Sequence, residues 1–151
     1  MTHFGSEILG SEFPDDDGLA NPELLIALEQ HAANASTYNN AQVLAALGNS
    51  PRLLIPVVAQ IDTQNDDGTE KDSSIMSVTF ESSDGRIGLP VFSGVEALAE
   101  WDPEARPIPR SAKDIARSCL AENFDAMLLD MGSAHRYVIA KSSMEILASL
   151  P

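Results

Sequence analysis

Residues 85–101 read GRIGLPVFSGVEALAEW, and they combine the exit of a turn, a short strand, a helix start and the chain's single tryptophan. The preceding Ser83-Asp84-Gly85-Arg86 contains the Asp-Gly pair that favours a tight hairpin turn. After the strand, Ser93-Gly94-Val95-Glu96 has the spacing of a capping box, in which the serine caps the helix and the glutamate reaches back. The stretch therefore predicts a strand over 87–92 that leads directly into a helix ending at Trp101.

Other strands are expected on both sides of this stretch. Residues 75–81 alternate between apolar and polar side chains, which predicts the antiparallel partner of the 87–92 strand. Residues 52–61 are almost continuously apolar, as in a strand covered on both faces, although Pro56 implies a local irregularity. Residues 126–131 read as a further buried strand and residues 137–140 as another.

Helices are expected between the strands and at both ends of the chain. Asn21-Pro22-Glu23 is a strong helix start, and a second short helix is expected over 40–47, with Gly48 as its stop. Ser111 with Asp114 predicts another helix start, and Ser142-Ser143-Met144-Glu145 is a further capping box. Together the elements predict an α+β fold: a mixed β-sheet of about five strands with helices packed on it, and an N-terminal helical hairpin.

Acidic residues gather in two segments that we expect to be solvated. Residues 1–20 contain Glu7, Glu12, Asp15, Asp16 and Asp17 but neither Lys nor Arg, which predicts an acidic flexible tail before a single domain over 21–151. A second acidic stretch, 62–74, reads as a loop. Both segments could become ordered on a partner. Neither run has the ligand spacing of a calcium loop, so no metal site is expected.

The overall charge excludes several classes of partner. The chain has 151 residues and a formal net charge of −14, a field that repels nucleic-acid phosphates and anionic lipids. We therefore expect no nucleic-acid partner and no membrane association. The N-terminus lacks the features of a signal peptide, and no apolar run approaches the roughly 20 residues of a membrane span, so a cytoplasmic protein is expected.

The sequence offers no catalytic constellation and no cofactor motif. Cys119 lies on the apolar face of a helix and is expected to be a buried, inert thiol. Ser93 reads as a helix cap rather than a nucleophile, and His135 as part of a solvated hairpin tip; a small-anion site at His135 is the less favoured alternative. No glycine-rich phosphate loop follows any strand. Catalytic residues and cofactors are therefore expected to be absent.

The remaining candidate site is a surface around the helix that ends at Trp101. Aromatic and arginine side chains are favoured at interfaces, and Phe92, Trp101, Arg106 and Arg110 lie close together in the sequence. Three interpretations stay open. Phe92 and Trp101 either complete the core beneath the extended proline-rich passage, contact a partner or a second copy, or line a small-molecule pocket.

Four segments in combination resemble a known family, the SseB N-terminal-domain family as it occurs in actinobacteria. They are Leu53 with Ile55-Pro56-Val57, the Asp84-Gly85-Arg86 turn, Leu89-Pro90-Val91-Phe92-Ser93, and Glu96-Ala97-Leu98 through Trp101. The resemblance extends from about Asn21 to the end of the chain. The family is named for enhanced serine sensitivity in enteric bacteria; its molecular activity is not established, and the resemblance implies no catalytic residues.

Two functions are compatible with the sequence. The first is a non-enzymatic cytoplasmic interaction or regulatory module, which would bind a protein partner or form a homodimer. Its motivation is the lack of a catalytic constellation together with the solvated acidic runs. The alternative is a small-molecule-binding protein or enzyme linked to amino-acid (serine) metabolism, which the family name suggests.

Overall fold

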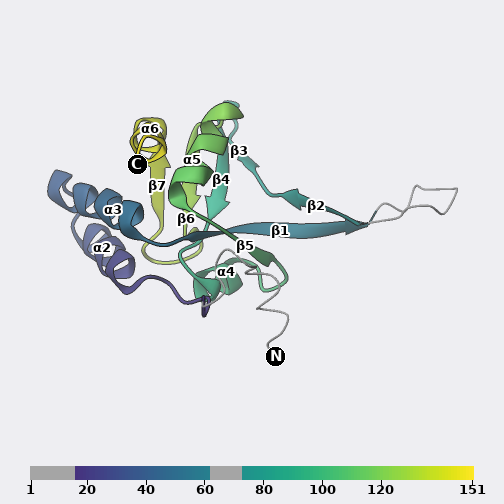
Figure 1. The fold of residues 1–151 in the computed structure, drawn as a ribbon, viewed down its shortest axis with the longest axis horizontal. Helices are drawn as coiled ribbons and strands as arrows, with labels where there is room; N and C mark the ends of the chain where they lie inside the picture. Colours follow the sequence, from purple (N-terminus) through teal and green to yellow (C-terminus); the bar gives the residue numbers. More distant parts are fainter. Residues whose placement is uncertain (1–15, 62–72) are drawn as a thin grey trace, which may run out of the picture.

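The structure, a computed structural model, describes residues 16–61 and 73–151 and confirms the predicted α+β class (Figure 1). The described residues form helices α2 (Pro22–Ala33), α3 (Thr37–Asn49), α4 (Val95–Trp101), α5 (Ala112–Ala121) and α6 (Lys141–Ala148). Their strands are β1 (Leu53–Ile61), β2 (Ser73–Ser77), β3 (Phe80–Glu81), β4 (Ile87–Val91), β5 (Arg106–Arg110), β6 (Ala126–Leu129) and β7 (Tyr137–Ala140). The expected N-terminal helical hairpin is the pair α2 and α3.

The strands divide between two sheets, where the sequence predicted one. One sheet has the order β2-β1-β5 and is antiparallel; the other has the order β3-β4-β6-β7 and contains the parallel pair β4–β6. The division occurs at Val78 and Thr79, which interrupt the strand expected over 75–81, so that β2 joins the first sheet and β3 the second. A bridge between Leu54 and Phe92, with both N···O distances 2.8 Å, connects the two sheets.

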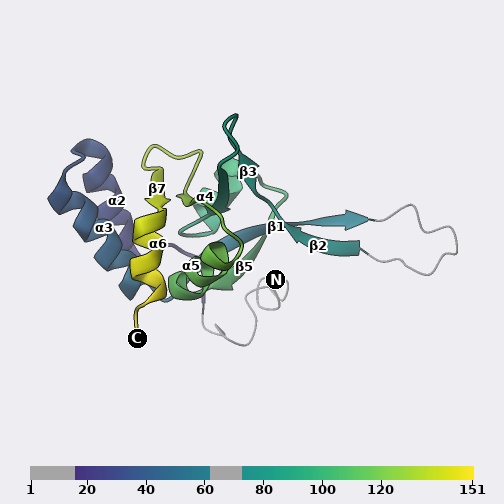
Figure 2. The same ribbon diagram turned by 90° about the horizontal axis from the view of Figure 1, so that it is seen from above.

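Helices cover one face of the β3-β4-β6-β7 sheet. Helices α5 and α6 pack on each other and on β6, and the α2–α3 hairpin lies beside α6 (Figures 1 and 2). The inward-facing strand residues in this core are Leu89, Val91, Met127, Leu129, Tyr137 and Ile139. A smaller core beneath α4 contains Leu54, Phe92 and Leu98. One face of the β3-β4-β6-β7 sheet is therefore covered by helices, and the opposite face is not.

Two of the five predicted helix starts are confirmed and three differ, one of them at Ser93. The side chains of Asn21 and Ser111 accept hydrogen bonds from the first turns of α2 and α5, as predicted. Helix α3 begins at Thr37 rather than Asn40, because Ser36 caps it, and Gly48 lies inside its last turn. The capping box predicted at 142–145 is wrong, since α6 begins at Lys141 without a side-chain cap.

None of the helices within 16–61 and 73–151 is long and apolar enough to cross a membrane.

Candidate functional site

The four residues of the predicted surface do not form one continuous patch. Phe92 is 0% exposed and packs with Leu54 and Leu98, as the core interpretation expects. Trp101 is partly exposed and lies against Phe92, with 5.3 Å between the ring centroids. Arg106 and Arg110 are exposed on β5. Because Phe92 is completely buried, it is unavailable to a partner.

Arg110 instead borders a hollow of about 570 Å³ between β1 and α5. Asp114 and Glu122 of α5 line the same hollow, together with Cys119. The arginine also donates from Nη1 to the carbonyl oxygen of Pro109 at 2.8 Å. The lining carries charges of both signs, and the hollow shows no preference for an anionic or a cationic ligand.

A fully buried aspartate, Asp130, is the centre of a polar cluster that the sequence did not single out. Strands β4 and β6 are parallel, so their carboxyl ends meet at one edge; Asp130 directly follows β6, and Ser93 lies two residues after the end of β4. Asp130 accepts from the Ser93 backbone N–H at 2.7 Å and from Ser93 Oγ at 2.6 Å. The predicted capping box at Ser93 is therefore wrong: Gly94 is the N-cap of α4, and the serine hydroxyl is committed to Asp130.

His135 and Arg52 complete this buried cluster, which we define as Arg52, Ser93, Asp130 and His135. His135 Nε2 lies 2.8 Å from Asp130 Oδ2, so the histidine belongs to the cluster and not to a solvated hairpin tip. Arg52 Nη1 donates to the Ser93 carbonyl oxygen at 2.8 Å. Asp130 also holds a positive φ of 53°, a left-handed conformation that aspartate tolerates better than most residues.

Serine, histidine and aspartate meet here, but they are in the wrong order for nucleophilic catalysis. In a catalytic triad the histidine lies between the serine and the carboxylate, so that it can take the serine proton. In this cluster the carboxylate lies between the other two, and Ser93 is only 1% exposed. The arrangement ties the ends of two strands together and offers no accessible nucleophile.

Arg52 also holds the segment that precedes α2. Its Nε and Nη2 donate to the Asp16 carboxylate at 2.6 and 2.7 Å, and Nη2 donates to the Leu19 carbonyl oxygen at 2.8 Å. The Gly18 carbonyl oxygen accepts from Val95 N at 2.8 Å. Residues 16–20, predicted as the end of the tail, are thus part of the folded domain. Residues 1–15, and residues 62–72 of the predicted acidic loop, lie outside the described residues.

The pKa of the Asp16 carboxyl is lowered by these contacts. Burial acts in the opposite direction and is the largest single influence, because it disfavours the charged form. The hydrogen bonds from Arg52 and from the Gly18 backbone, together with the charge of Arg52, outweigh it. The ion pair therefore forms part of the folded structure at neutral pH.

A hollow of about 400 Å³ lies beside the buried cluster, between α2 and α4. Glu29, Glu96 and Glu100 line it, together with His135 and the Ser93-Gly94 backbone. Position 94 requires glycine because the backbone at Ala20 lies very close to it: a Cβ at this position would lie 2.5 Å from the Ala20 nitrogen. The charged side chains of this lining are acidic, and no group suited to holding a metal ion occurs within 16–61 and 73–151.

Cys119 is confirmed as a buried thiol. It is 0% exposed in the main core, and burial raises the pKa of its thiol to about 11. At neutral pH it is therefore protonated and a poor nucleophile.

The most unusual surface is the face of the β3-β4-β6-β7 sheet that the helices leave uncovered. Strand register places Phe80 opposite Gly88, Gly88 opposite Ala126, and Ala126 opposite Ala140, which makes one apolar row across four strands. Leu128 and Val138 form a second paired position on the same side. We call these six residues, Phe80, Gly88, Ala126, Leu128, Val138 and Ala140, the open face.

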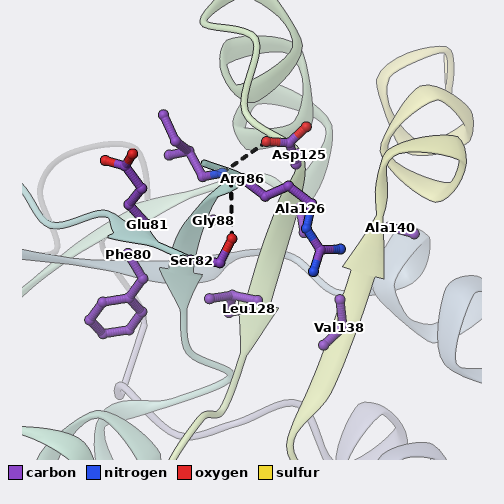
Figure 3. Close-up of a pocket in the computed structure, with 11 residues that line it drawn as sticks. Phe80, Glu81, Ser82, Arg86, Gly88, Asp125, Ala126, Leu128, Val138 and Ala140 are labelled. Atoms are coloured by element: carbon purple, nitrogen blue, oxygen red, sulfur yellow. Dashed lines mark hydrogen bonds between the residues drawn. The ribbon is translucent and has the colours of Figure 1, made fainter. Parts of the chain in front are cut away.

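The open face forms a hollow of about 510 Å³ (Figure 3). Leu128 lies in the middle, with Phe80 on one side and Val138 on the other. A Cβ on Gly88 would lie 2.8 Å from Leu128 Cδ1, so glycine is what allows Leu128 to lie across β4. Phe80 is 39% exposed and Val138 is 56% exposed. Trp101 borders this face, because its ring contacts Phe80 edge-on at 5.9 Å.

Comparison with known proteins assigns the chain to a family. The family model for the SseB protein N-terminal domain matches residues 24–145. The chain belongs to this family. No curated protein and no solved structure shows a significant match.

A sequence signal for the open face of this SseB domain exists in β6 and β7. These strands read AMLL and YVIA, without polar residues at alternate positions. A sheet with one solvated face normally alternates apolar and polar residues, whereas continuous apolar runs are typical of strands covered on both faces. The described residues cover only one face of these strands. The sequence thus indicates a cover that this part of the chain does not supply.

Proposed function

We propose that this SseB domain is a non-enzymatic, cytoplasmic interaction module that binds a partner protein through the open face. The observation that carries the proposal is the apolar row across four strands, in which Phe80 and Ala140 are exposed and Ala126 is partly exposed, where a solvated sheet normally presents polar side chains. Exposed apolar patches with polar edges are typical of protein interaction sites. Glu81, Ser82 and Arg86 supply such an edge here.

The geometry of the buried cluster supports a module without catalysis. Ser93 is enclosed, its hydroxyl is bonded to Asp130, and Cys119 is a protonated thiol in the core. A nucleophile must be reachable by substrate and activated by a neighbouring base. Neither residue meets both requirements.

A pair of matched variants tests the proposal. Val138→Glu places a charge on the open face, and Ile146→Glu does the same on α6, where the isoleucine is 54% exposed, close to the 56% of Val138. We expect a partner recovered from an extract of the source cells by the wild-type chain to be lost with Val138→Glu and kept with Ile146→Glu. Retention of every bound protein by Val138→Glu would refute this surface as the binding site.

The alternative, a small-molecule-binding protein or enzyme of amino-acid metabolism, has weaker support. An amino acid carries a carboxylate, which proteins usually hold with Arg, Lys or a cluster of backbone N–H groups. The hollow beside the buried cluster is lined by three glutamates and, among the described residues, by neither Lys nor Arg. A thermal-shift panel of amino acids distinguishes the two functions, because the interaction module predicts no response.

A further inference from the structure

We infer that the occupant of the open face is a basic amphipathic segment of a partner protein, whose apolar side chains enter the hollow while Lys or Arg residues lie along its edges. The inference rests on the proposed function and specifies the chemistry of the partner. It follows from the shape of the hollow and from the charges around it.

The shape favours bulky apolar side chains from a single segment. The row from Gly88 through Ala126 to Ala140 has small side chains, whereas Phe80 and Val138 rise at the two sides. A hollow of about 510 Å³ is comparable with the 300–1,000 Å³ of typical ligand sites. Sheet faces in α+β proteins are commonly covered by helices, as α5 and α6 cover the opposite face here.

The charges at the edge favour a cationic partner. Glu81, Arg86 and Asp125 are the charged residues that line the hollow. The single cation among them is Arg86, whose Nε lies 3.1 Å from the Asp84 carboxylate in the hairpin turn, in an ion pair with both side chains largely exposed. With Asp84 included, this edge carries three carboxylates against one guanidinium, a formal charge of −2; Asp84 pairs with Arg86, and Asp125 accepts a hydrogen bond from the Ile87 N–H at 2.8 Å. Around it lies a chain with a formal net charge of −14, which attracts basic segments and speeds their association.

The same charges argue against two other occupants. A second copy of the chain would bring two molecules of charge −14 face to face. Residues 1–15 of the chain itself include apolar residues such as Phe4 and Phe13, but their charged side chains are Glu7, Glu12 and Asp15. Neither occupant carries the positive charge that would complement the carboxylates at the edge of the hollow.

Three series of short synthetic peptides test the inference. All share one helical apolar stripe of Leu, Phe and Val, and the polar face consists of Lys in the first series, Ser in the second and Glu in the third. Fluorescence anisotropy with the full chain measures their binding at low and at high salt. We expect the Lys series to bind more tightly than the Ser series, the Glu series to bind least, and the preference for Lys to shrink in high salt.

Two pairs of variants locate the binding. Val138→Glu should weaken the Lys series by about tenfold or more, as expected for the loss of one interface anchor, whereas Ile146→Glu should not. Glu81→Lys should reduce the preference for Lys over Glu peptides. Glu145→Lys, which makes the same change of net charge on an exposed position of α6, should reduce it less.

The outcomes separate failure of this inference from failure of the proposed function. Equal binding of the three series at the open face would overturn the basic partner and leave the interaction module intact. So would self-association of the wild-type chain that Val138→Glu abolishes, since the occupant would then be a second copy. Peptide binding that appears only after Phe4→Ser and Phe13→Ser would identify residues 1–15 as the occupant. If no peptide binds, no self-association occurs and Val138→Glu changes nothing, both proposals fail.

Discussion

At the scale of single residues, the buried carboxylate of Asp130 joins the ends of two strands. Asp130 is 0% exposed, and its carboxylate accepts hydrogen bonds from the Ser93 N–H at 2.7 Å and the Ser93 hydroxyl at 2.6 Å. The Nε2 atom of His135 lies 2.8 Å from the same carboxylate. A buried carboxylate is costly unless hydrogen bonds compensate its lost hydration. These donors come from the end of β4 and from the segment between β6 and β7. Asp130 therefore couples the ends of parallel strands through side chains as well as through the backbone ladder.

Replacing this carboxylate should destabilise the fold strongly. Asn tolerates the positive φ of Asp130, so Asp130→Asn removes the charge without adding backbone strain. One of the donors of Ser93 or His135 then faces an NH₂ group, and we expect a loss of about 3 kcal/mol in the free energy of unfolding. Urea denaturation at neutral pH measures it. Asp102→Asn, at a carboxylate that accepts an exposed hydrogen bond from Glu104 N, is the control and should cost less than about 1 kcal/mol. Equal losses in the two variants would contradict the role of the cluster.

At the scale of elements, the sequence predicted what depends on local patterns. The Asp-Gly turn, the caps at Asn21 and Ser111 and the helix ending at Trp101 are all confirmed, because each involves residues close together in the chain. The capping box predicted at Ser93 is wrong because the hydrogen bond that decides it is not local. The Ser93 hydroxyl bonds a residue 37 positions away, and this tertiary hydrogen bond replaces the local one.

The open face and the position of His135 also depend on tertiary structure and could not be predicted from local patterns. The continuous apolar character of β6 was visible in the sequence, but it predicted burial on both faces. Only the strand order shows that Ala126 and Leu128 point away from the helices. The sequence predicts a solvated tip for His135, because no local pattern connects it with the buried carboxylate of Asp130, five residues earlier.

The segment at residues 16–20 should act as a pH-sensitive element of stability. The folded-state pKa of Asp16 is below its ordinary value of 3.8, so its pair with Arg52 stabilises the fold above that pH and is lost as the pH falls through the folded pKa. Asp16→Asn leaves the nearly buried Arg52 without its counter-charge and should cost about 3 kcal/mol at neutral pH. Urea denaturation across a pH series should show this difference shrinking below about pH 4. Asp17→Asn, at the exposed neighbour, should behave like wild type; a difference independent of pH would contradict the ion-pair assignment.

Strand β5 is an edge whose two prolines protect it. The backbone N–H and carbonyl of Leu54 bond to Phe92, on the side of β1 away from β5. Leu54 and Pro109 are therefore a non-hydrogen-bonded pair, and the backbone polar groups of Pro109 face the outer edge of β5. Because alternate residues of a strand face the same edge, those of Pro107 face it too. The outer edge consequently lacks donors at these positions, which discourages addition of another strand.

Restoring the missing donors should promote self-association. The double variant Pro107→Val with Pro109→Val supplies two N–H groups on this edge, and we expect its apparent mass by light scattering to rise with concentration more steeply than that of the wild-type chain. The single variant Pro103→Val, in the turn before β5, serves as the control. If the double variant matches the control, the prolines have no protective role.

At the scale of the whole molecule, the two faces of the four-stranded sheet have different surroundings. One face and its strand ends are fixed by the helical core and by the buried cluster, which also fastens residues 16–20. That rigid support holds Phe80, Leu128 and Val138 on the other face, where Phe80 and Val138 are exposed and Leu128 is partly exposed, because the strands that carry them cannot rotate without breaking the core. Excess acidic charge surrounds this arrangement and opposes compaction.

Salt should therefore stabilise the wild-type chain. With 23 Asp or Glu against 9 Lys or Arg, repulsion among exposed carboxylates is the larger electrostatic effect, and it is screened once the Debye length falls to about 10 Å near 0.1 M salt. The Asp16–Arg52 pair is nearly buried, so salt weakens it much less. We expect thermal denaturation followed by circular dichroism to show a melting temperature that rises by several degrees with added NaCl. Glu145→Lys, which changes the formal net charge from −14 to about −12 at an exposed site, should give a smaller rise. A melting temperature that falls with salt would mean that specific ion pairs, rather than net repulsion, dominate the electrostatic free energy of this fold.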